Sequence, residues 1–454
     1  MGYTVVNPYN GEVLKKFTPQ SNVEVAAALE EAEEFYQEQK KIAVKVRAAK
    51  LNHFGAVLLE HREELAREAA LNMGKRLSEG RNEIDLCANL AVYYAEHAEL
   101  LQPKPYSYGE GKTALLEYHS LGIIASVEPW NFPYSQVVRV LAPNYLIGNP
   151  VILKHAGIVA GCAELLDQLV QQAGWEKGAF KNLFISHEQV SQIIADKRVQ
   201  GVALTGSEAA GRTIASAAGK SLIKSTMELG GSDVFAILDD ADVKTAVMDA
   251  TAARLRNAGQ VCTSAKRFIV EKKIAAEFIA GIKQSFATQK MGDPLDETTE
   301  LAPLSSHSAA VELQAQVDAA IENGAHVLVA GGIIEGEGNF FKPIVLTNVK
   351  PDNPAYRQEF FGPVAQVFIA EDDEQVIALA NDSDFGLAGA VYSADKERAH
   401  RVASKIETGQ VFINRPSGAH PELPFGGVKN SGYGREMSDL GLYEFTNQKI
   451  IVFK

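Results

Sequence analysis

The sequence is poor in cysteine, in basic charge and in long apolar runs, and each shortage excludes a class of protein. Three cysteines in 454 residues, an odd and small number, favour a reducing cytoplasm without structural disulfides. Because 57 acidic residues outnumber 44 lysines and arginines, the net charge of -13 argues against nucleic acid as a partner. No apolar run approaches the roughly 20 residues of a membrane span, and the N-terminus shows no signal peptide. We therefore expect a cytoplasmic protein with no membrane partner and no metal.

A glycine-rich dinucleotide fingerprint is also missing. No Gly-x-Gly-x-x-Gly occurs in the chain, so the ordinary Rossmann motif is absent. The stretch from Gly206 to Thr213 is close to a phosphate-binding P-loop, but Arg212 stands where a lysine is required, which argues against a nucleoside triphosphatase. A helix that opens with glycine still offers free N–H groups to a pyrophosphate.

Apolar runs at 150–154, 201–205 and 234–238 are typical of strands in a covered parallel sheet, and helical patterns lie between them. We therefore predict an α/β fold, and a chain of this length is expected to form two or three domains. A capping box at 21–24 predicts one helix, and a second helical region runs from about Val44 to Asn72, with Gly74 at its end. We expect strands at 115–118, 122–127, 409–414 and 449–453.

The most informative stretch runs from Arg256 to Ser264. It closes a helical run over 242–255, and Gly259 suits the helix end, where a left-handed residue is usually needed. Cys262 therefore lies at a junction between elements, among polar and flexible neighbours, whereas Cys87 and Cys162 lie in helical runs and are interpreted as small buried hydrophobes. Cys262 is a candidate nucleophile, which needs a base nearby, and Glu228 is a candidate base.

Further motifs contain residues that could assist a nucleophilic Cys262. Asn131 lies between Pro129 and Pro133 and could donate an amide N–H to an oxyanion, although a packed turn would explain it equally well. The sequence Glu228-Leu229-Gly230-Gly231, then Gly259-Gln260-Val261-Cys262, then 359–364 and 424–436, resembles the NAD(P)-dependent aldehyde dehydrogenase family. This resemblance covers nearly the whole chain. It implies that Cys262 attacks the aldehyde, Asn131 stabilises the oxyanion and Glu228 activates water, while Glu436 is an auxiliary acid in some members.

The resemblance also implies where a cofactor binds and how the chain is divided. The expected cofactor contacts are Trp130, Lys154, His155, Gly157, Gly206, Ser207, Gly211, Leu229, Gly230, Glu359 and Phe361. Many NAD-preferring members carry a glutamate where this chain has Gly157, so NADP is favoured over NAD. The implied domains are a Rossmann-like cofactor domain at 1–101 and 121–230, a catalytic domain at 231–430, and oligomerisation elements at 102–120 and 431–454. A homodimer or homotetramer is expected, with the C-terminal tail joining a neighbour's sheet.

Two arginines suggest the substrate. Arg139 and Arg256 match positions that hold a carboxylate in succinate-semialdehyde dehydrogenases, although solvated surface arginines are the plain alternative. The family's substrate serine falls near Ala419 and is missing, so Ser417 or His420 is expected to replace it. Succinate semialdehyde is the predicted substrate. Uncharged aliphatic or aromatic aldehydes, a cysteine hydrolase or acyltransferase without a nucleotide, and a non-catalytic binding protein remain the alternatives.

Overall fold

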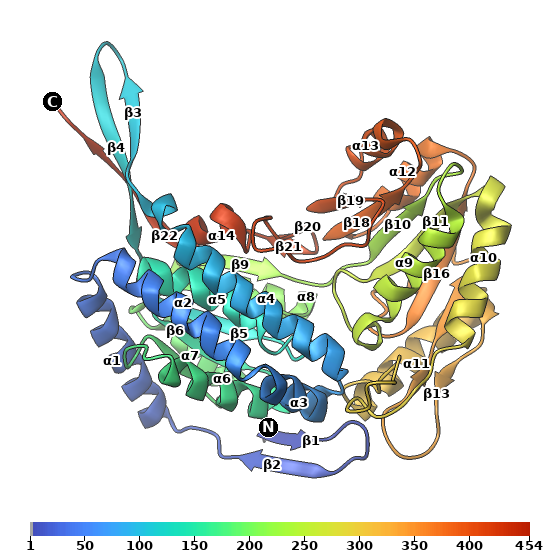
Figure 1. Cartoon of the computed structure of the whole chain (residues 1–454), viewed down its shortest axis with the longest axis horizontal. Coiled ribbons are helices and arrows are strands. Elements are labelled where there is room, and N and C mark those ends of the chain that lie inside the picture. Colours follow the sequence, from blue (N-terminus) through green and yellow to red (C-terminus); the bar gives the residue numbers. More distant parts are fainter. Residues whose placement is uncertain (1–2) are drawn as a thin grey trace.

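Two mostly parallel β-sheets, each covered by helices, form two lobes that face each other in the computed structural model, which describes residues 3–454 (Figure 1). The first lobe is built from the first half of the chain and the second from most of the remainder, and the segment with β20 (Val428–Lys429), β21 (Gly432–Tyr433) and α14 (Ser438–Glu444) returns to the first lobe. The predicted α/β fold is confirmed. No helix within the described part of the chain is long and apolar enough to cross a membrane.

The sheet of the first lobe has six strands in the order β21-β9-β8-β5-β6-β7, and all but β21 run parallel. Alternate residues of these strands face opposite helical layers, as the two-residue period of a strand requires. Ile124 packs toward the helices α2 to α6, and Ala125 packs toward α1, α7 and α8. The strand bounds are β5 (Ile123–Glu128), β6 (Val151–His155), β7 (Phe180–Asn182), β8 (Val199–Thr205) and β9 (Lys224–Glu228). The helix bounds are α1 (Asn22–Gln39), α2 (Val44–Glu60), α3 (Arg62–Met73), α4 (Leu77–Glu96), α5 (Ser135–Ile147), α6 (Ala160–Gln172), α7 (His187–Ala195) and α8 (Glu208–Ser221).

The sheet of the second lobe has seven strands in the order β12-β15-β16-β11-β10-β18-β19, with only β12 antiparallel. Its inner strand β10 is buried along its whole length, as its uninterrupted apolar sequence predicts. The strand bounds are β10 (Asp233–Ile237), β11 (Ala265–Glu271), β12 (His326–Val329), β15 (Ile344–Thr347), β16 (Val364–Ala370), β18 (Ala388–Tyr392) and β19 (Gln410–Ile413). The helices are α9 (Val243–Leu255), α10 (Lys272–Ala287), α11 (His307–Glu322), α12 (Asp373–Asn381) and α13 (Lys396–Ala403).

A protruding hairpin, β3 (Lys104–Tyr108) and β4 (Lys112–Ser120), forms a three-stranded sheet with the tail strand β22 (Thr446–Val452) (Figure 1). Pro105 lies in β3, at the sheet edge, where a missing N–H is tolerated. The strand expected at 122–127 is β5 and belongs to the six-stranded sheet. β22 pairs with β4 of its own chain, so contact of the tail with a neighbouring subunit stays a prediction.

The predicted helix starts and stops are mostly found. Ser21 and Glu24 form both hydrogen bonds of a capping box, and Gly74 ends α3 in the left-handed conformation with φ of 81°. The single helix predicted from Val44 to Asn72 is instead divided into α2 and α3. His61 leaves the helical conformation between them, and its Nδ1 contacts Glu64 Oε2 at 2.8 Å in the first turn of α3.

The remaining strands form three two-stranded sheets at the margins of the lobes, namely β1 (Tyr3–Val6) with β2 (Val13–Phe17), β13 (Gly332–Ile333) with β14 (Phe341–Lys342), and β17 (Phe385–Gly386) with β20.

Candidate active site

A tight left-handed turn presents Cys262. The helix α9 ends at Leu255, four residues earlier than its expected glycine, and Asn257, Ala258 and Gly259 follow with φ of 51°, 53° and 77°. A Cβ at Gly259 would collide with the backbone of Gly362, so only glycine fits this approach. The buried guanidinium of Arg254 donates to Val364 O at 2.7 Å and to Gly259 O at 3.3 Å. The turn is therefore fixed against the 359–364 segment.

Cys262 lies between two cavities, because it lines both of them. The larger cavity, of about 610 Å³, we call the arginine-side cavity. The smaller, of about 270 Å³, we call the glycine-side cavity. A thiol at the boundary of two cavities can contact two different ligands at once, which is the arrangement that a reaction between a substrate and a cofactor requires.

The glycine-side cavity brings together residues from four separate motifs. Trp130 and Phe361 meet edge to face, with ring centroids 5.7 Å apart, and Glu359 accepts from Gly231 N at 3.2 Å. Of the predicted cofactor contacts and the oxyanion donor, this cavity is lined by Trp130, Asn131, Gly206, Ser207, Leu229, Gly230, Glu359 and Phe361. Gly206 and Ser207 precede α8, where free N–H groups can meet phosphate.

Four predicted cofactor contacts do not line the glycine-side cavity, namely Lys154, His155, Gly157 and Gly211. The remaining residues of the lining are Pro129, Gln136, Thr205 and Cys262. Gly211 is inside α8, where a Cβ would meet the Leu229 side chain at 2.6 Å, so it makes room for Leu229. Gly157 has only the Tyr3 ring near its would-be Cβ. Lys154, at the end of β6, is partly buried, and burial lowers its pKa.

His155 stays a predicted cofactor contact, but its ring is buried and both ring nitrogens contact groups within the chain. Nε2 contacts Pro133 O at 2.8 Å, and Nδ1 accepts from Ala156 N at 2.9 Å. Burial lowers the pKa of His155 to about 4, so the ring is neutral. His155 therefore anchors the loop that carries Asn131.

The arginine-side cavity collects all four predicted substrate residues, Arg139, Arg256, Ser417 and His420, together with Ala419. The Ser417 hydroxyl donates to Thr263 O at 2.8 Å, next to the nucleophile. The buried Nε of Arg256 has no hydrogen-bond partner among residues 3–454. A buried donor without a partner is costly in free energy, so this cation is suited to a ligand anion.

Arg139 differs from the expectation for a free carboxylate ligand. It is buried, its Nε lies 2.9 Å from Glu436 Oε2, and its guanidinium stacks over the Phe425 ring at 4.5 Å. Glu436 already supplies one carboxylate to it. Arg139 therefore contributes positive charge to the cavity wall, and Arg256 is the better candidate for binding a substrate carboxylate.

Asn131 is fixed by three contacts. Its Nδ2 donates to Gln260 O at 2.9 Å, its Oδ1 accepts from Gln136 Nε2 at 3.0 Å, and its backbone O accepts from Asn257 Nδ2 at 2.9 Å. An amide nitrogen carries two hydrogens, and only one of them is used here. The amide is therefore pre-aimed and retains a donor for a ligand.

The Cys262 thiol is not ionised by its surroundings alone. Burial raises its pKa to about 11, although the Lys266 and Arg139 charges act to lower it. The fully buried Lys266 Nζ donates to the backbone oxygens of Val261 and Cys262 at 2.7 Å each, and it lies 2.9 Å from Glu359 Oε1. A base or a ligand charge is needed to form the reactive thiolate.

Glu228 ends β9 and is buried, but it is absent from the linings of both cavities. Neither of its carboxylate oxygens has a hydrogen-bond partner within residues 3–454. Its Oε1 lies beside Gly426, 2.7 Å from the position where a Cβ would stand. Burial raises the pKa of Glu228 well above its usual value, and the Glu436 charge adds to this.

Comparison with known proteins agrees with this geometry, because a model of the aldehyde dehydrogenase family matches residues 1–451. The chain belongs to the aldehyde dehydrogenase family. It is 45% identical over 450 residues to the succinate-semialdehyde dehydrogenase (NADP+) of Deinococcus radiodurans, covering 99% of this chain and 94% of the relative. It is 41% identical over 442 residues to the succinate semialdehyde dehydrogenase Sad of Escherichia coli, covering 97% and 96%.

Solved structures are equally similar. The succinic semialdehyde dehydrogenase of Streptococcus pyogenes, in complex with NADP+, superposes with a TM-score of 0.97 at 45% identity and 99% coverage of both chains. Gox0499 superposes with a TM-score of 0.98 at 43% identity and full coverage of both chains.

Sequence reasoning missed several residues of this aldehyde dehydrogenase site. Gln136 lines both cavities and orients Asn131, and its position five residues after Asn131 was the available signal. Lys266, four residues after Cys262 in a buried strand, could have been noticed as a cation in an apolar run. Arg415 lines the arginine-side cavity and contacts His420 Nε2 at 3.1 Å, and no local pattern marked it.

Proposed function

We propose that this aldehyde dehydrogenase oxidises succinate semialdehyde to succinate, with NADP+ preferred to NAD+. The observation that carries the proposal is the unpartnered Nε of Arg256 in the same cavity as Cys262. A guanidinium can donate two parallel hydrogen bonds to a carboxylate, so it suits the far end of a semialdehyde. The relatives named for succinate semialdehyde support the same substrate.

The residues present fit a nicotinamide dinucleotide. The glycine-side cavity ends at a helix N-terminus, opened by Gly206, where a Cβ would meet nothing closer than 3.7 Å. Trp130 and Phe361 offer aromatic surface there, and Glu359 offers a carboxylate that can accept from ribose hydroxyls. At Gly157 there is no carboxylate to repel a 2′-phosphate, and Lys154 lies three residues earlier. The NADP+ in the S. pyogenes structure supports this preference.

The proposed reaction begins when Cys262 gives its thiol proton to water in the cavity and its Sγ attacks the aldehyde carbon. The second N–H of the Asn131 amide and the backbone N–H of Cys262 would donate to the oxygen as it gains negative charge. The nicotinamide cofactor supplies the electron acceptor when it is bound. Removal of the carbon's hydrogen with its electron pair leaves a thioester on Cys262.

Hydrolysis of that thioester needs a base for water. Glu228 is the proposed base, and its side chain must turn from Gly426 toward Cys262 to reach the water, because it does not line either cavity in its present position. A carboxyl without hydrogen-bond partners is free to make this turn. Water then adds to the carbonyl carbon, the carbon–sulfur bond breaks, and Cys262 leaves as a thiolate.

An aldehyde panel with both cofactors tests the proposal. We expect kcat/KM for succinate semialdehyde to exceed that for butanal, and NADP+ to give a higher kcat/KM than NAD+. Preference for butanal would contradict the substrate assignment, and a tenfold higher efficiency with NAD+ would contradict the cofactor assignment. Absence of any reduced cofactor with every aldehyde would favour the hydrolase alternative, which leaves the glycine-side cavity without a use.

The proposed domain division follows the two sheets. Residues 1–101 and 121–230 would form the cofactor domain and 231–430 the catalytic domain, as the separation of β5 to β9 from β10 to β19 supports. The hairpin and β22 expose Tyr106, Tyr108, Ile450 and Val452, which supports burial in a homodimer or homotetramer. Light scattering tests this, because a monomer at micromolar concentration would contradict it.

A further inference from the structure

A row of polar side chains crosses the carboxyl ends of three neighbouring strands in the six-stranded sheet. Val127 of β5 pairs with Leu204 of β8, so the next residues, Glu128 and Thr205, are neighbours. Thr205 in turn pairs with Glu228 of β9. Residues in register on parallel strands point to the same face, and the strands are about 4.8 Å apart. Glu128, Thr205 and Glu228 therefore form one continuous row.

The three side chains are buried, with at most 6% of their surface exposed, and they share an unusual lack of partners. Glu128 Oε1 accepts from Ser126 Oγ at 2.8 Å, but Glu128 Oε2, Thr205 Oγ1 and both Glu228 oxygens have no hydrogen-bond partner within residues 3–454. Buried polar atoms are nearly always satisfied, and the exceptions require a functional explanation or an ordered water. Four such atoms in one row can accept and pass a proton.

Burial and the negative charge of Glu436 favour a proton on the row, and two arginines act against it. The charge of Arg139 on α5 lowers the pKa of each of Glu128, Glu228 and Glu436, and the charge of Arg435 also lowers that of Glu228. Burial raises the pKa of Glu128 well above its usual value, the Glu436 charge adds to this, and Ser126, Thr205 and Arg139 act in the opposite direction. His155, which pairs with Glu128 in register, is neutral, and the Glu444 charge raises the pKa of Glu436.

We propose that Glu128 is a positioning residue for Glu228, to which it is connected by the Thr205 hydroxyl, and that it receives the proton that hydrolysis places on Glu228. This inference rests on the proposed aldehyde oxidation. When water attacks the thioester, one water proton moves to Glu228, the hydroxyl becomes part of the acid, and the sulfur leaves with the bonding electrons. Glu228 then gives its proton to Thr205 Oγ1 as the hydroxyl's own proton moves to Glu128 Oε2.

Thr205 also explains how the proton leaves. Of the three side chains in the row, only Thr205 lines the glycine-side cavity. Once the reduced cofactor has left that cavity, water there can accept the proton from Glu128 through the same hydroxyl. One proton enters the row and one leaves it in each turnover, so Glu228 is a carboxylate again before the next thioester forms.

Transient kinetics of the full-length enzyme with succinate semialdehyde and NADP+ test the inference, with Glu128→Gln and Thr205→Val as variants. Glu128→Gln removes the proton acceptor and Thr205→Val removes the hydroxyl, and both replacements preserve the shape of the side chain. We expect the first-turnover formation of NADPH to stay within twofold of wild type, and kcat to fall about tenfold, so that a burst appears or grows. Thr205→Ser, which keeps the hydroxyl, should retain wild-type kcat.

Two further measurements separate a proton path from a structural effect. The double variant Glu128→Gln/Thr205→Val should be no slower than either single variant, since both replacements break the same path. As a control, Asp167→Asn, which alters a largely buried carboxyl on α6, should leave kcat unchanged. Wild-type kcat in both single variants from pH 6 to 9, or multiplied losses in the double variant, would overturn the inference. If Glu128→Gln does not fold, the pair Thr205→Val and Thr205→Ser decides it. A wild-type enzyme that forms no NADPH would instead refute the proposed function.

Discussion

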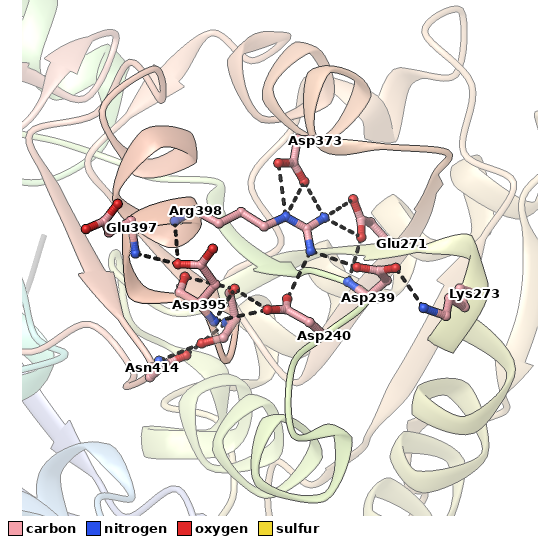
Figure 2. Close-up of polar contacts among 10 residues, drawn as sticks. Asp239, Asp240, Glu271, Lys273, Asp373, Asp395, Glu397, Arg398 and Asn414 are labelled. Atoms are coloured by element: carbon pink, nitrogen blue, oxygen red, sulfur yellow. Dashed lines mark hydrogen bonds and ion pairs between the residues drawn. The ribbon is translucent and has the colours of Figure 1, made fainter.

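Arg398 and Arg256 are two arginines with opposite surroundings. Arg398 on α13 contacts four carboxylates, Asp373 at 2.6 Å, Asp239 at 2.7 Å, and Asp240 and Glu271 at 3.1 Å (Figure 2). Arg256 lines the cavity of the nucleophile, and its buried Nε has no partner in residues 3–454. Arg398 is therefore paired with four anions, whereas the Nε of Arg256 has no partner in the described residues.

The difference separates structural charge from functional charge. The Arg398 cluster joins four parts of the chain that are distant in sequence. They are α13, α12, the segment just after β10 and the last residue of β11. Its contacts are complete without a ligand. At Arg256 the protein leaves a donor unpaired at a cost in stability, which selection tolerates where a ligand supplies the anion. We therefore expect Arg398 substitutions to change stability and Arg256 substitutions to change catalysis.

The largest effect is expected for Arg398→Ala. Removing the shared cation leaves four carboxylates to repel one another, and Glu271 is almost fully buried. Loss of one partner of a buried pair costs about 3–5 kcal/mol, but this cluster is partly exposed, so about 2–3 kcal/mol of unfolding free energy should be lost. Chemical denaturation measures it. Arg401→Ala, an exposed arginine on the same helix, is the matched control and should change stability by less than about 0.5 kcal/mol.

The second prediction concerns pH. Hydrogen bonds from Arg398 lower the pKa of Asp239 to about 2 and also lower that of Asp373. A carboxyl whose folded pKa is depressed stabilises the fold above its unfolded pKa, here 3.8, and loses that contribution as the pH falls through the folded value. Burial raises the pKa of Glu271 instead, so this carboxyl begins to lose its charge at higher pH. The stability gap between wild type and Arg398→Ala should shrink between pH 5 and pH 2. A constant gap would refute the electrostatic explanation.

The two regions also differ in how well the sequence predicts them. Cys262, Asn131, Glu359 and Phe361 lie in short motifs whose local pattern carries their chemistry, and the structure brings all four to one cavity. The Arg398 cluster left no such signal, because its members come from four separate segments and look like ordinary solvated charges. Helix caps were predictable where one residue determines the conformation, as at Gly74.

The local pattern was least informative where tertiary contacts override it. His155 looked like a free donor after a strand, but folding surrounds its ring with the backbone of Pro133 and Ala156. Arg139 looked like a substrate ligand, but the return of the C-terminal segment to the first lobe places Glu436 against it. The His155–Pro133 and Arg139–Glu436 contacts join residues that are too far apart in the sequence for a local pattern to reveal them.

The third prediction concerns the effect of Arg256 on catalysis. Arg256→Ala should lower kcat/KM for succinate semialdehyde at least tenfold, about 1.4 kcal/mol or more, because the substrate carboxylate loses its cation. Butanal, which has no carboxylate, should lose less than threefold. The melting temperature should not fall, because the removed Nε had no partner within residues 3–454. Equal losses for both aldehydes would mean that Arg256 does not bind the carboxylate.

The smallest effect is expected at Lys154, a third cation that tests whether a missing anion marks a ligand site. Lys154 is the last but one residue of β6 and pairs with Val127, which lies just before the loop of Pro129 and Trp130 that lines the glycine-side cavity. Burial lowers its pKa, and no carboxylate of the described chain forms an ion pair with it. A 2′-phosphate would supply the anion that Lys154 lacks.

Lys154→Ala should therefore raise the KM for NADP+ about threefold to tenfold, since a half-solvated charge pair is worth about 1 kcal/mol. The KM for NAD+, which has no 2′-phosphate, should change by less than twofold, and kcat should stay the same with either cofactor. The effect should also weaken as salt is added, because screening acts on partly exposed charges. Lys154→Arg keeps the charge and serves as the control. An equal rise in KM for both cofactors would show that Lys154 supports the shape of the strand end, and an unpaired cation would then be insufficient evidence for a ligand site.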